Sequence, residues 1–257
     1  MIDPRAVVDS LAHLAADIEV GPFTVIGPEV EIGQGTWIGP HVVIQGPTRI
    51  GRENRIYSFA SLGEIPQDKK YGGERTWLEI GDRNTIREFC TINRGTVQDA
   101  GITRLGDDNW IMAYVHIAHD CQVGHRTVFA NGASLSGHVQ IGDDVVLGGF
   151  VLVYQFCRIG AHSFCGFACG VHKDVPPFVT VAGYRAQPHG INAEGLRRRG
   201  FPLDEIRAIK QAYKVLYRSD LRLEEAIEEI RKLAADFPRL QALVDFLLAP
   251  SVHGIVR

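Results

Sequence analysis

Aliphatic residues recur at every sixth position along most of the chain. The spacing begins near the N-terminus, stops after Leu62, resumes from Ile80 to Ile92, and then runs from Leu105 to Val171. The first run consists of Ile2, Val8, Leu14, Val20, Ile26, Ile32, Ile38, Ile44, Ile50, Ile56 and Leu62. An α-helix repeats its apolar face about every 3.6 residues and a strand about every 2, so neither produces this pattern. A six-residue repeat instead predicts short strands joined by corners, with the aliphatic side chains pointing inward.

Three such repeats close a triangular coil of about 18 residues, and successive coils stack at the strand spacing of about 4.8 Å. Gly often follows the inward residue, as in Ile26-Gly27 and Ile141-Gly142, and we expect it to take backbone angles that other residues avoid. The sequence therefore predicts an all-β parallel helix over residues 1–190. The two interruptions, near 63–79 and 94–104, predict projecting loops, which often carry function.

Near the C-terminus the hexad spacing gives way to a helical one. A proline-rich segment at 174–188 predicts a junction. Apolar residues at helical spacing then predict one helix within 201–219 and another within 220–237, and Pro238 separates these from a short third helix. We expect residues 191–257 to form a small α-helical domain.

The overall composition excludes several classes of protein. The 257 residues carry a net charge of −3, which argues against a general nucleic-acid binder. No signal peptide is evident at the N-terminus, and no apolar stretch reaches the ~18 residues that a membrane helix needs. We therefore expect a cytoplasmic protein without a transmembrane segment. The five cysteines fall in register with the repeat, which predicts core residues rather than disulfides or metal ligands.

The strongest candidates for catalysis lie in the segment HIAHD at 116–120. Because one coil takes about 18 residues, His119 should lie beside Gly137, and Asp120 beside His138. A His can act as general base on a hydroxyl, and a neighbouring carboxylate can orient it. An N–H of Gly137 could stabilise an oxyanion. Since no GxSxG motif is present, direct attack by a substrate hydroxyl is favoured over a covalent acyl-enzyme.

Two further polar segments could bind a substrate or a partner. The first loop contains the run Gln67–Tyr71, which is dense in hydrogen-bonding groups, although a solvated surface loop would look the same. The run Arg197–Arg199 could meet phosphates or an acidic carrier protein, although it could also be a basic helix end.

Several segments together resemble the UDP-N-acetylglucosamine O-acyltransferases of lipid A synthesis, and the resemblance runs nearly end to end. The segments are GEIPQDKKYGGERTWLEIGDRNTIREFCTINRGT, HIAHDCQVG, SLSGHVQIGDD, QFCRIGAHSF and NAEGLRRRGF. The resemblance implies a left-handed path for the β-helix, which periodicity alone does not give. It also implies transfer of an (R)-3-hydroxyacyl chain from acyl carrier protein to the 3-position of UDP-N-acetylglucosamine, the first step of lipid A synthesis.

The resemblance further implies how the protein assembles and what it needs. It implies a homotrimer with sites between neighbouring prisms, with acyl carrier protein and a UDP-sugar as partners. No metal or cofactor is expected, because the acyl group arrives on the phosphopantetheine of the carrier protein.

Residue roles also follow from the resemblance. His119 would be the general base supported by Asp120, and the Gly137 N–H would stabilise the oxyanion. Gln155 would contact the nucleotide or pantetheine region. The positions implied to contact the sugar and acyl chain are Gln67, Asp68, Lys70, His116 and His138. The positions implied to hold the UDP portion are Asn192, Glu194 and Arg199, with Arg198 on the phosphopantetheine.

At several positions the chain departs from the family pattern. Tyr154 precedes Gln155 where a His is common, Asn93 replaces a His, and Tyr184-Arg185 replaces Asn-His. These substitutions raise the alternative that the acceptor is a 3-amino UDP-sugar, which would give an amide.

Phe167 is a second informative departure. It should lie one coil above Gly149, at a position where related enzymes often carry Gly to admit a long chain. A large ring there should close the acyl groove early, so we expect a preference for a chain of about ten to twelve carbons.

Three other classes of protein remain open on the sequence. A zinc hydratase of the γ-carbonic anhydrase type would use His116, His119 and His138, but their spacing differs from that family's. The related N-acyltransferase of the same pathway normally has an extra N-terminal domain. A non-catalytic binding scaffold is disfavoured by the stacked base and oxyanion positions.

Overall fold

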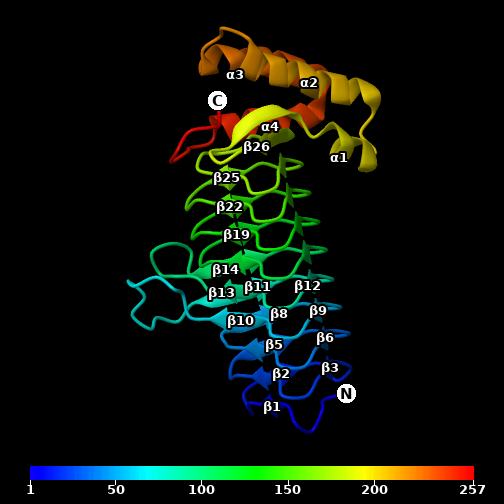
Figure 1. Cartoon of the computed structure of the whole chain (residues 1–257), viewed down its shortest axis with the longest axis vertical. Helices are drawn as coiled ribbons and strands as arrows, with labels where there is room; N and C mark the ends of the chain where they lie inside the picture. Colours follow the sequence, from blue (N-terminus) through cyan, green and yellow to red (C-terminus); the bar gives the residue numbers. More distant parts are fainter.

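The computed structural model describes residues 1–257, which form a long triangular prism with a helical domain at one end (Figure 1). Three parallel sheets make the faces of the prism, and the chain passes through them in turn. Sheet I contains β1 (Val7–Val8), β4 (Val25–Ile26), β7 (Val43–Ile44), β10 (Ser61–Glu64), β13 (Thr91–Asn93), β16 (His116–Ile117), β19 (Ser134–Leu135), β22 (Leu152–Val153) and β25 (Gly170–Val171). Sheet II contains β2 (His13–Leu14), β5 (Val30–Ile32), β8 (Thr48–Ile50), β11 (Trp77–Ile80), β14 (Ile102–Leu105), β17 (Gln122–Val123), β20 (Gln140–Ile141) and β23 (Arg158–Ile159). Sheet III contains β3 (Glu19–Val20), β6 (Trp37–Ile38), β9 (Arg55–Ile56), β12 (Thr85–Ile86), β15 (Trp110–Ile111), β18 (Val128–Phe129), β21 (Val146–Leu147), β24 (Phe164–Cys165), β26 (Val179–Ala182) and β27 (Gln187–Ile191).

The interior of the prism is filled by the aliphatic residues of the hexads. Each coil places its residues beside those 18 positions on, as in the pairing of Ile26 with Ile44. The main core cluster contains 43 buried residues, including all five cysteines, which are free thiols. The predicted parallel β-helix is therefore confirmed, and its stability comes from stacked aliphatic columns.

The expected role of the hexad glycines is wrong in one respect. The left-handed backbone angles at the corners belong mainly to other residues, such as Phe23 with φ 60° and His41 with φ 58°. Glycine is needed instead because the next coil lies close: a Cβ on Gly33 would lie 2.7 Å from the Gly51 carbonyl oxygen, and one on Gly142 would lie 2.6 Å from the Ala161 nitrogen. These glycines permit tight stacking of coils rather than unusual turns.

Two loops leave the prism on the same side, between β10 and β11 and between β13 and β14 (Figure 1). They span residues 65–76 and 94–101, so they are shorter than the interruptions in the sequence pattern. The strands extend further than expected because Leu78 continues the ladder between Thr48 and Thr103. Both loops therefore begin and end on ordered strands.

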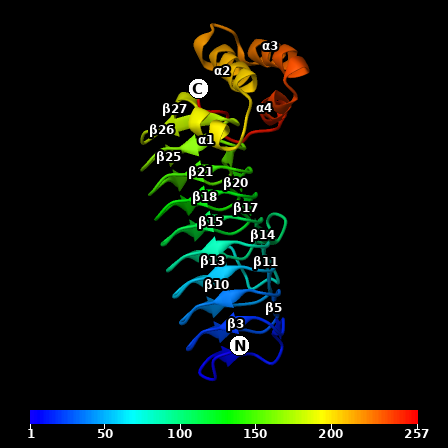
Figure 2. The same cartoon turned by 90° about the vertical axis from the view of Figure 1, so that its right-hand side faces the viewer.

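The helical domain covers the end of the prism through the antiparallel hairpin of β26 and β27 (Figures 1 and 2). Its elements are α1 (Ala193–Arg198), α2 (Leu203–Arg218), α3 (Leu223–Asp236), the short 3₁₀ helix η1 (Pro238–Leu240) and α4 (Gln241–Leu248). They share a second core of 15 buried residues. No helix combines the length and apolarity required to cross a membrane. The C-terminal tail returns to the prism, where Ile255 bridges to Asp174.

Candidate active site

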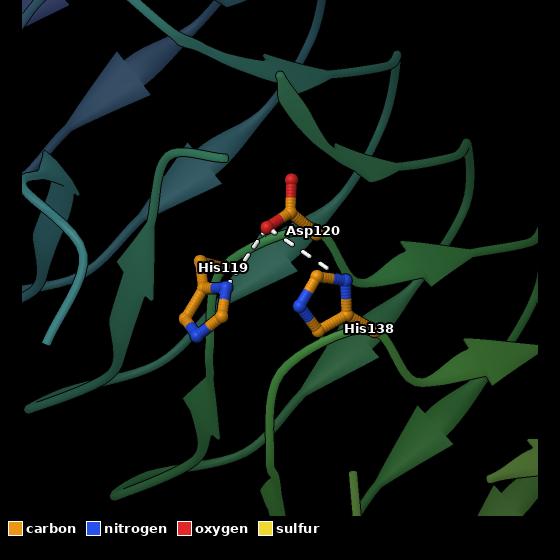
Figure 3. Close-up of side chains that lie close together, drawn as sticks. All are labelled: His119, Asp120 and His138. Atoms are coloured by element: carbon orange, nitrogen blue, oxygen red, sulfur yellow. Dashed lines mark hydrogen bonds and ion pairs between the residues drawn. The ribbon is translucent and has the colours of Figure 1, made fainter. Parts of the chain in front are cut away.

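His119 and Asp120 form a buried imidazole–carboxylate pair at the corner between sheets I and II. They follow β16, and Asp120 takes the left-handed corner angle with φ 60°. The His119 Nδ1 lies 2.8 Å from Asp120 Oδ2, and Figure 3 shows the carboxylate between two imidazole rings. The carboxylate is 1% exposed and the imidazole 14% exposed. A Nδ1–H donated to the carboxylate leaves Nε2 free to accept a proton, as a general base requires.

The Asp120 carboxylate is anchored by the second loop. The Thr96 N–H and hydroxyl both donate to it, at 2.9 and 2.6 Å, and the Asp120 N–H donates to the Thr103 hydroxyl at 2.8 Å. Burial raises the pKa of Asp120, but the hydrogen bonds from His119 and Thr96 outweigh this and lower the pKa below its ordinary value. Asp120 is therefore a carboxylate near neutral pH. Sequence reasoning missed both Thr96 in this loop and Thr103 on β14, because only the fold brings them to this corner.

Gly137 lies one coil further, directly against the His119 ring. A Cβ on Gly137 would lie 2.6 Å from His119 Cε1 and 2.7 Å from Nε2, so only glycine fits beneath the imidazole. The Gly137 N–H donates no hydrogen bond within the chain. The base and a free backbone donor thus share one corner, and the predicted stacking of these residues is confirmed.

Gly137→Ala is expected to lower kcat about 30-fold, because the added methyl group must displace the imidazole from its position. Steady-state kinetics measures this, and circular dichroism checks that the fold is kept. Gly166→Ala is the matched control, since its methyl group would lie 3.3 Å from the Ala182 side chain, where small shifts accommodate it. A kcat near wild type in Gly137→Ala would contradict the close packing of ring and glycine.

His138 and His116 complete the cluster of imidazoles. The His138 ring stacks on Phe156 at 4.5 Å between centroids and stands perpendicular to His119 at 5.1 Å. The His116 Nδ1 lies 2.7 Å from the Thr91 hydroxyl. Burial, and to a smaller extent the neighbouring His119, lowers the pKa of His116, so its ring stays neutral near pH 7.

The donor set of this corner differs from that of the zinc hydratase alternative. The ligand atoms of His119, Asp120 and His138 lie within 4.8 Å of one another, while His116 is outside the group. The Asp120 oxygens already accept hydrogen bonds from Thr96 and His119. Two imidazoles and an occupied carboxylate do not make the three-imidazole set of the hydratase.

The first loop carries its predicted binding residues at the surface. Gln67 and Lys70 are exposed, while the Asp68 side chain accepts the Lys70 N–H at 3.0 Å. No hydrogen bond joins these three residues to the histidine cluster. Asn93 is buried at the base of this loop, where its amide donates to the Ile65 carbonyl at 2.8 Å. This departure from the family pattern therefore supports the loop, which weakens it as evidence for a different sugar.

The predicted UDP-binding residues lie at another corner, between sheets II and III. Asn192 caps α1 by accepting the Gly195 N–H at 3.1 Å and also donates to the His162 carbonyl at 2.9 Å. Glu194 pairs with Arg198 at 3.0 Å. Within one chain, the predicted UDP-binding residues and His119 lie at different corners of the prism. They could contribute to one site only if the corner of one copy lay beside the other corner of a second copy.

Arg199 joins the helical domain to the prism at this corner. Its Nε donates to Asp144 at 2.7 Å, and Arg126 donates to the same carboxylate at 3.0 Å. A cavity of about 600 Å³ lies beside them, lined in part by His162 and Phe201. Burial raises the pKa of Asp144, but hydrogen bonds from Arg126 and Arg199 outweigh it and lower the pKa.

Asp144→Asn is expected to lower the free energy of unfolding by about 2 kcal/mol at pH 7, because both arginines lose a charged acceptor. A carboxyl whose folded pKa is depressed stabilises the fold above its unfolded pKa of about 3.8, and this contribution is lost as the pH falls through the folded pKa. Urea unfolding at pH 7 and at a series of pH values well below 3.8 measures the difference, which should shrink as the pH falls through the folded pKa. Asp143→Asn, at the neighbouring carboxylate, whose side chain is 42% exposed, should cost under ~1 kcal/mol. Equal losses in both variants would contradict the special role of Asp144.

The C-terminal tail reaches the coil above Gly137. His253 Nε2 lies 2.9 Å from the Gln155 carbonyl oxygen, and the His253 ring lies 5.5 Å from the Tyr154 ring. The Gln155 side chain is exposed, in the column that rises from His119. His253 carried no signal in the sequence, since the helical domain separates it from the repeat.

Phe167 lies against Gly149, as the 18-residue step predicts. A Cβ on Gly149 would lie 3.4 Å from the Phe167 ring, which also makes an edge contact with Phe150 at 6.0 Å between centroids. Phe167 is 73% exposed within the single chain. Its ring is thus available to border a groove on the outside of the prism.

Two family models match the chain. The model described as bacterial transferase hexapeptide matches residues 29–64 and 102–137, and the one described as UDP N-acetylglucosamine O-acyltransferase, domain 2, matches residues 174–256. Proteins named acyl-[acyl-carrier-protein]–UDP-N-acetylglucosamine O-acyltransferase from Halorhodospira halophila and Herminiimonas arsenicoxydans are 61% and 59% identical, and both comparisons cover 100% of this chain and 99% of the relative. Among solved structures, UDP-N-acetylglucosamine O-acyltransferase (LpxA) from Moraxella catarrhalis has a TM-score of 0.98 at 48% identity, and LpxA from Acinetobacter baumannii has 0.97 at 46%. Both cover 100% of this chain and 99% of the other.

The fold, the repeat and the imidazole–glycine corner define a left-handed β-helix acyltransferase of the hexapeptide class. Within that class, the chain belongs to the UDP-N-acetylglucosamine O-acyltransferase family.

Proposed function

We propose that the protein transfers an (R)-3-hydroxyacyl chain from acyl carrier protein to the 3-hydroxyl of UDP-N-acetylglucosamine, as the first step of lipid A synthesis. The observation that carries the proposal is the His119–Asp120 pair set against the unpartnered N–H of Gly137. Acyl transfer to a hydroxyl needs a base for the hydroxyl and a donor for the oxyanion, and this corner supplies both.

The proposed reaction proceeds by direct attack. His119 Nε2 removes the proton of the sugar 3-hydroxyl while the oxygen forms a bond to the thioester carbonyl carbon. The Gly137 N–H stabilises the resulting oxyanion. When the carbon–sulfur bond breaks, the imidazolium returns the proton to the departing thiolate of the phosphopantetheine. Asp120 stabilises the imidazolium throughout and remains ionised.

The outward residues of the prism support a homotrimer. Sheet II presents a charged ladder, in which Arg49 pairs with Glu31 at 3.2 Å and Arg104 pairs with Glu79 at 3.0 Å. The corner between sheets III and I instead carries a column of exposed, stacked rings with centroids 5.0 to 5.1 Å apart. The rings are those of Phe23, His41, Phe59, Phe89 and Tyr114. Three copies with this corner at the axis would bury the rings and leave sheet II in water.

This arrangement also completes the active site. Sheet I of one copy would face sheet III of the next, so the His119 corner would lie beside the neighbour's Arg199 corner. Analytical ultracentrifugation tests the assembly, and we expect three times the chain mass of 28.4 kDa. A monomer under active conditions would contradict the proposed arrangement of copies.

A product assay tests the proposed reaction. The protein is incubated with a panel of 3-hydroxyacyl carrier-protein thioesters and with UDP-N-acetylglucosamine or its 3-amino analogue, and products are identified by mass spectrometry. We expect the O-acyl sugar with the natural acceptor. Faster use of the amino sugar would instead favour the amide-forming alternative, and transfer to neither acceptor would contradict the proposal.

The proposal includes a cytoplasmic location and independence from metal ions and other cofactors. Cell fractionation tests the first. For the second, purified protein treated with EDTA and freed of chelator should keep its full activity. Loss of activity that zinc restores would favour the metal-dependent alternative.

A further inference from the structure

His138 has its own carboxylate partner, supplied by the second loop. The Asp99 Oδ2 lies 2.9 Å from His138 Nδ1, close to the 2.8 Å of the His119–Asp120 pair. The Asp120 Oδ2 faces the same nitrogen from 3.9 Å. The corner therefore contains two imidazole–carboxylate pairs, of which only one is accounted for by the proposed general base.

The contacts around His138 determine which of its ring nitrogens is free to accept a hydrogen bond. Both carboxylates face Nδ1, so the proton of the neutral ring resides there and Nε2 carries the lone pair. The ring cannot readily turn, because it stacks on Phe156 with an interplanar angle of 14° and meets His119 edge to face at 90°. The His138 side chain is 12% exposed, whereas Asp99 is 52% exposed.

The second loop thus supports both imidazoles of the corner. Thr96 anchors Asp120 from the buried part of the loop, and Asp99 reaches His138 from its exposed tip. The loop connects β13 to β14, so neither residue is in the hexad register.

We propose that Asp99 is a positioning residue that keeps His138 in the Nδ1–H form, so that Nε2 accepts a hydrogen bond from an O–H group of a substrate. The inference rests on the proposed acyl transfer, and it extends that function by assigning His138 the role of a hydrogen-bond acceptor. The O–H group belongs either to the acceptor sugar or to the 3-hydroxyl of the acyl chain. A comparison of acyl donors with and without the 3-hydroxyl distinguishes these two possibilities.

The first measurement does not depend on catalysis. Nitrogen-15 NMR of the histidine side chains in the full protein reports which ring nitrogen of His138 carries the proton, with His138→Gln used for assignment. We expect the Nδ1–H form in the wild type and in Asp99→Asn, whose amide oxygen can still accept. We expect a measurable Nε2–H population in Asp99→Ala. A predominantly Nε2–H ring in the wild type would overturn the inference, whatever the outcome of the activity assays.

The second measurement is kinetic. Asp99→Ala should lower kcat/KM about tenfold, as expected for loss of a residue that orients a functional imidazole, while Asp99→Asn should lose less than about threefold. Gln98→Ala is the matched control, because Gln98 is exposed in the same loop and its side chain makes no hydrogen bond. In a His138→Ala background, Asp99→Ala should cause no further loss beyond about twofold. A full tenfold loss in that background would indicate a general effect of the loop and contradict the proposal.

Activity with acyl donors that have or lack the 3-hydroxyl shows which substrate O–H group donates to His138. If His138 accepts from the 3-hydroxyl of the acyl chain, the loss in Asp99→Ala should disappear with a carrier-protein thioester that lacks this hydroxyl. If His138 accepts from the sugar, the loss should persist with both donors.

Discussion

His119→Ala is expected to lower kcat about 10³-fold, within the range that removal of a general base causes. The effect should be this large because His119 is the imidazole that lies directly against Gly137, the proposed oxyanion donor. The His116 Nδ1 faces the Thr91 hydroxyl, and the His138 ring stacks on Phe156. Transfer from the carrier-protein thioester, followed by mass spectrometry under single-turnover conditions, measures the loss in the chemical step.

His13→Ala is the control for this variant. His13 is also an imidazole on the prism, but it is exposed on β2 of sheet II, in the first coil and away from both corners of the proposed site. Its removal should change kcat less than about threefold, since it contacts no part of the proposed site. A similar loss in both variants, or retention of most activity in His119→Ala, would exclude His119 as the base.

Phe167→Gly is expected to shift the preference toward longer acyl chains by about 200-fold in the ratio of kcat/KM for a fourteen-carbon donor over a ten-carbon donor. The longer donor has four more methylenes, and each buried methylene contributes about 0.8 kcal/mol. The Phe167 ring lies over Gly149 and against Phe150, so its removal leaves open space at the corner between sheets III and I. A donor panel of stepped chain lengths measures the shift.

Two further variants make the Phe167 test specific. Phe167→Leu should give an intermediate shift, and Phe167→Tyr should retain the wild-type profile because the ring keeps its size. An unchanged chain-length profile in Phe167→Gly would show that another residue ends the acyl groove.

The hexad spacing predicted most of the prism because the inward aliphatic residues repeat every six positions, and this repeat fixes the place of each residue in its coil. The 18-residue step placed Gly137 against His119 and Phe167 against Gly149 without any knowledge of the loops. The pattern within a single hexad, in contrast, gave the wrong reason for the hexad glycines. Close contact between Gly33 and Gly51 is a property of neighbouring coils, and a single hexad carries no trace of it.

The supporting residues of the site could not be predicted in this way. Thr96 and Asp99 lie in a loop without periodicity, so only the three-dimensional path of that loop brings them to Asp120 and His138. His253 is separated from Gln155 by 98 positions and reaches it because the tail folds back from the helical domain.

The sequence did not show that the residues predicted to bind the nucleotide also make hydrogen bonds within the chain. Asn192 uses both polar atoms of its side chain within the chain, and Arg199 is tied to Asp144. Contacts of these residues with a nucleotide remain predictions. They require that the existing hydrogen bonds be shared or exchanged when a substrate binds between two copies.

The most direct test of the account is a crystal structure of the protein with its acylated UDP-sugar product. We predict that the sugar O3 lies within hydrogen-bond reach of His119 Nε2, about 2.6–3.2 Å, and that the acyl carbonyl oxygen faces the Gly137 N–H. A product bound away from the corner between sheets I and II, with His119 Nε2 out of reach of O3, would contradict the account.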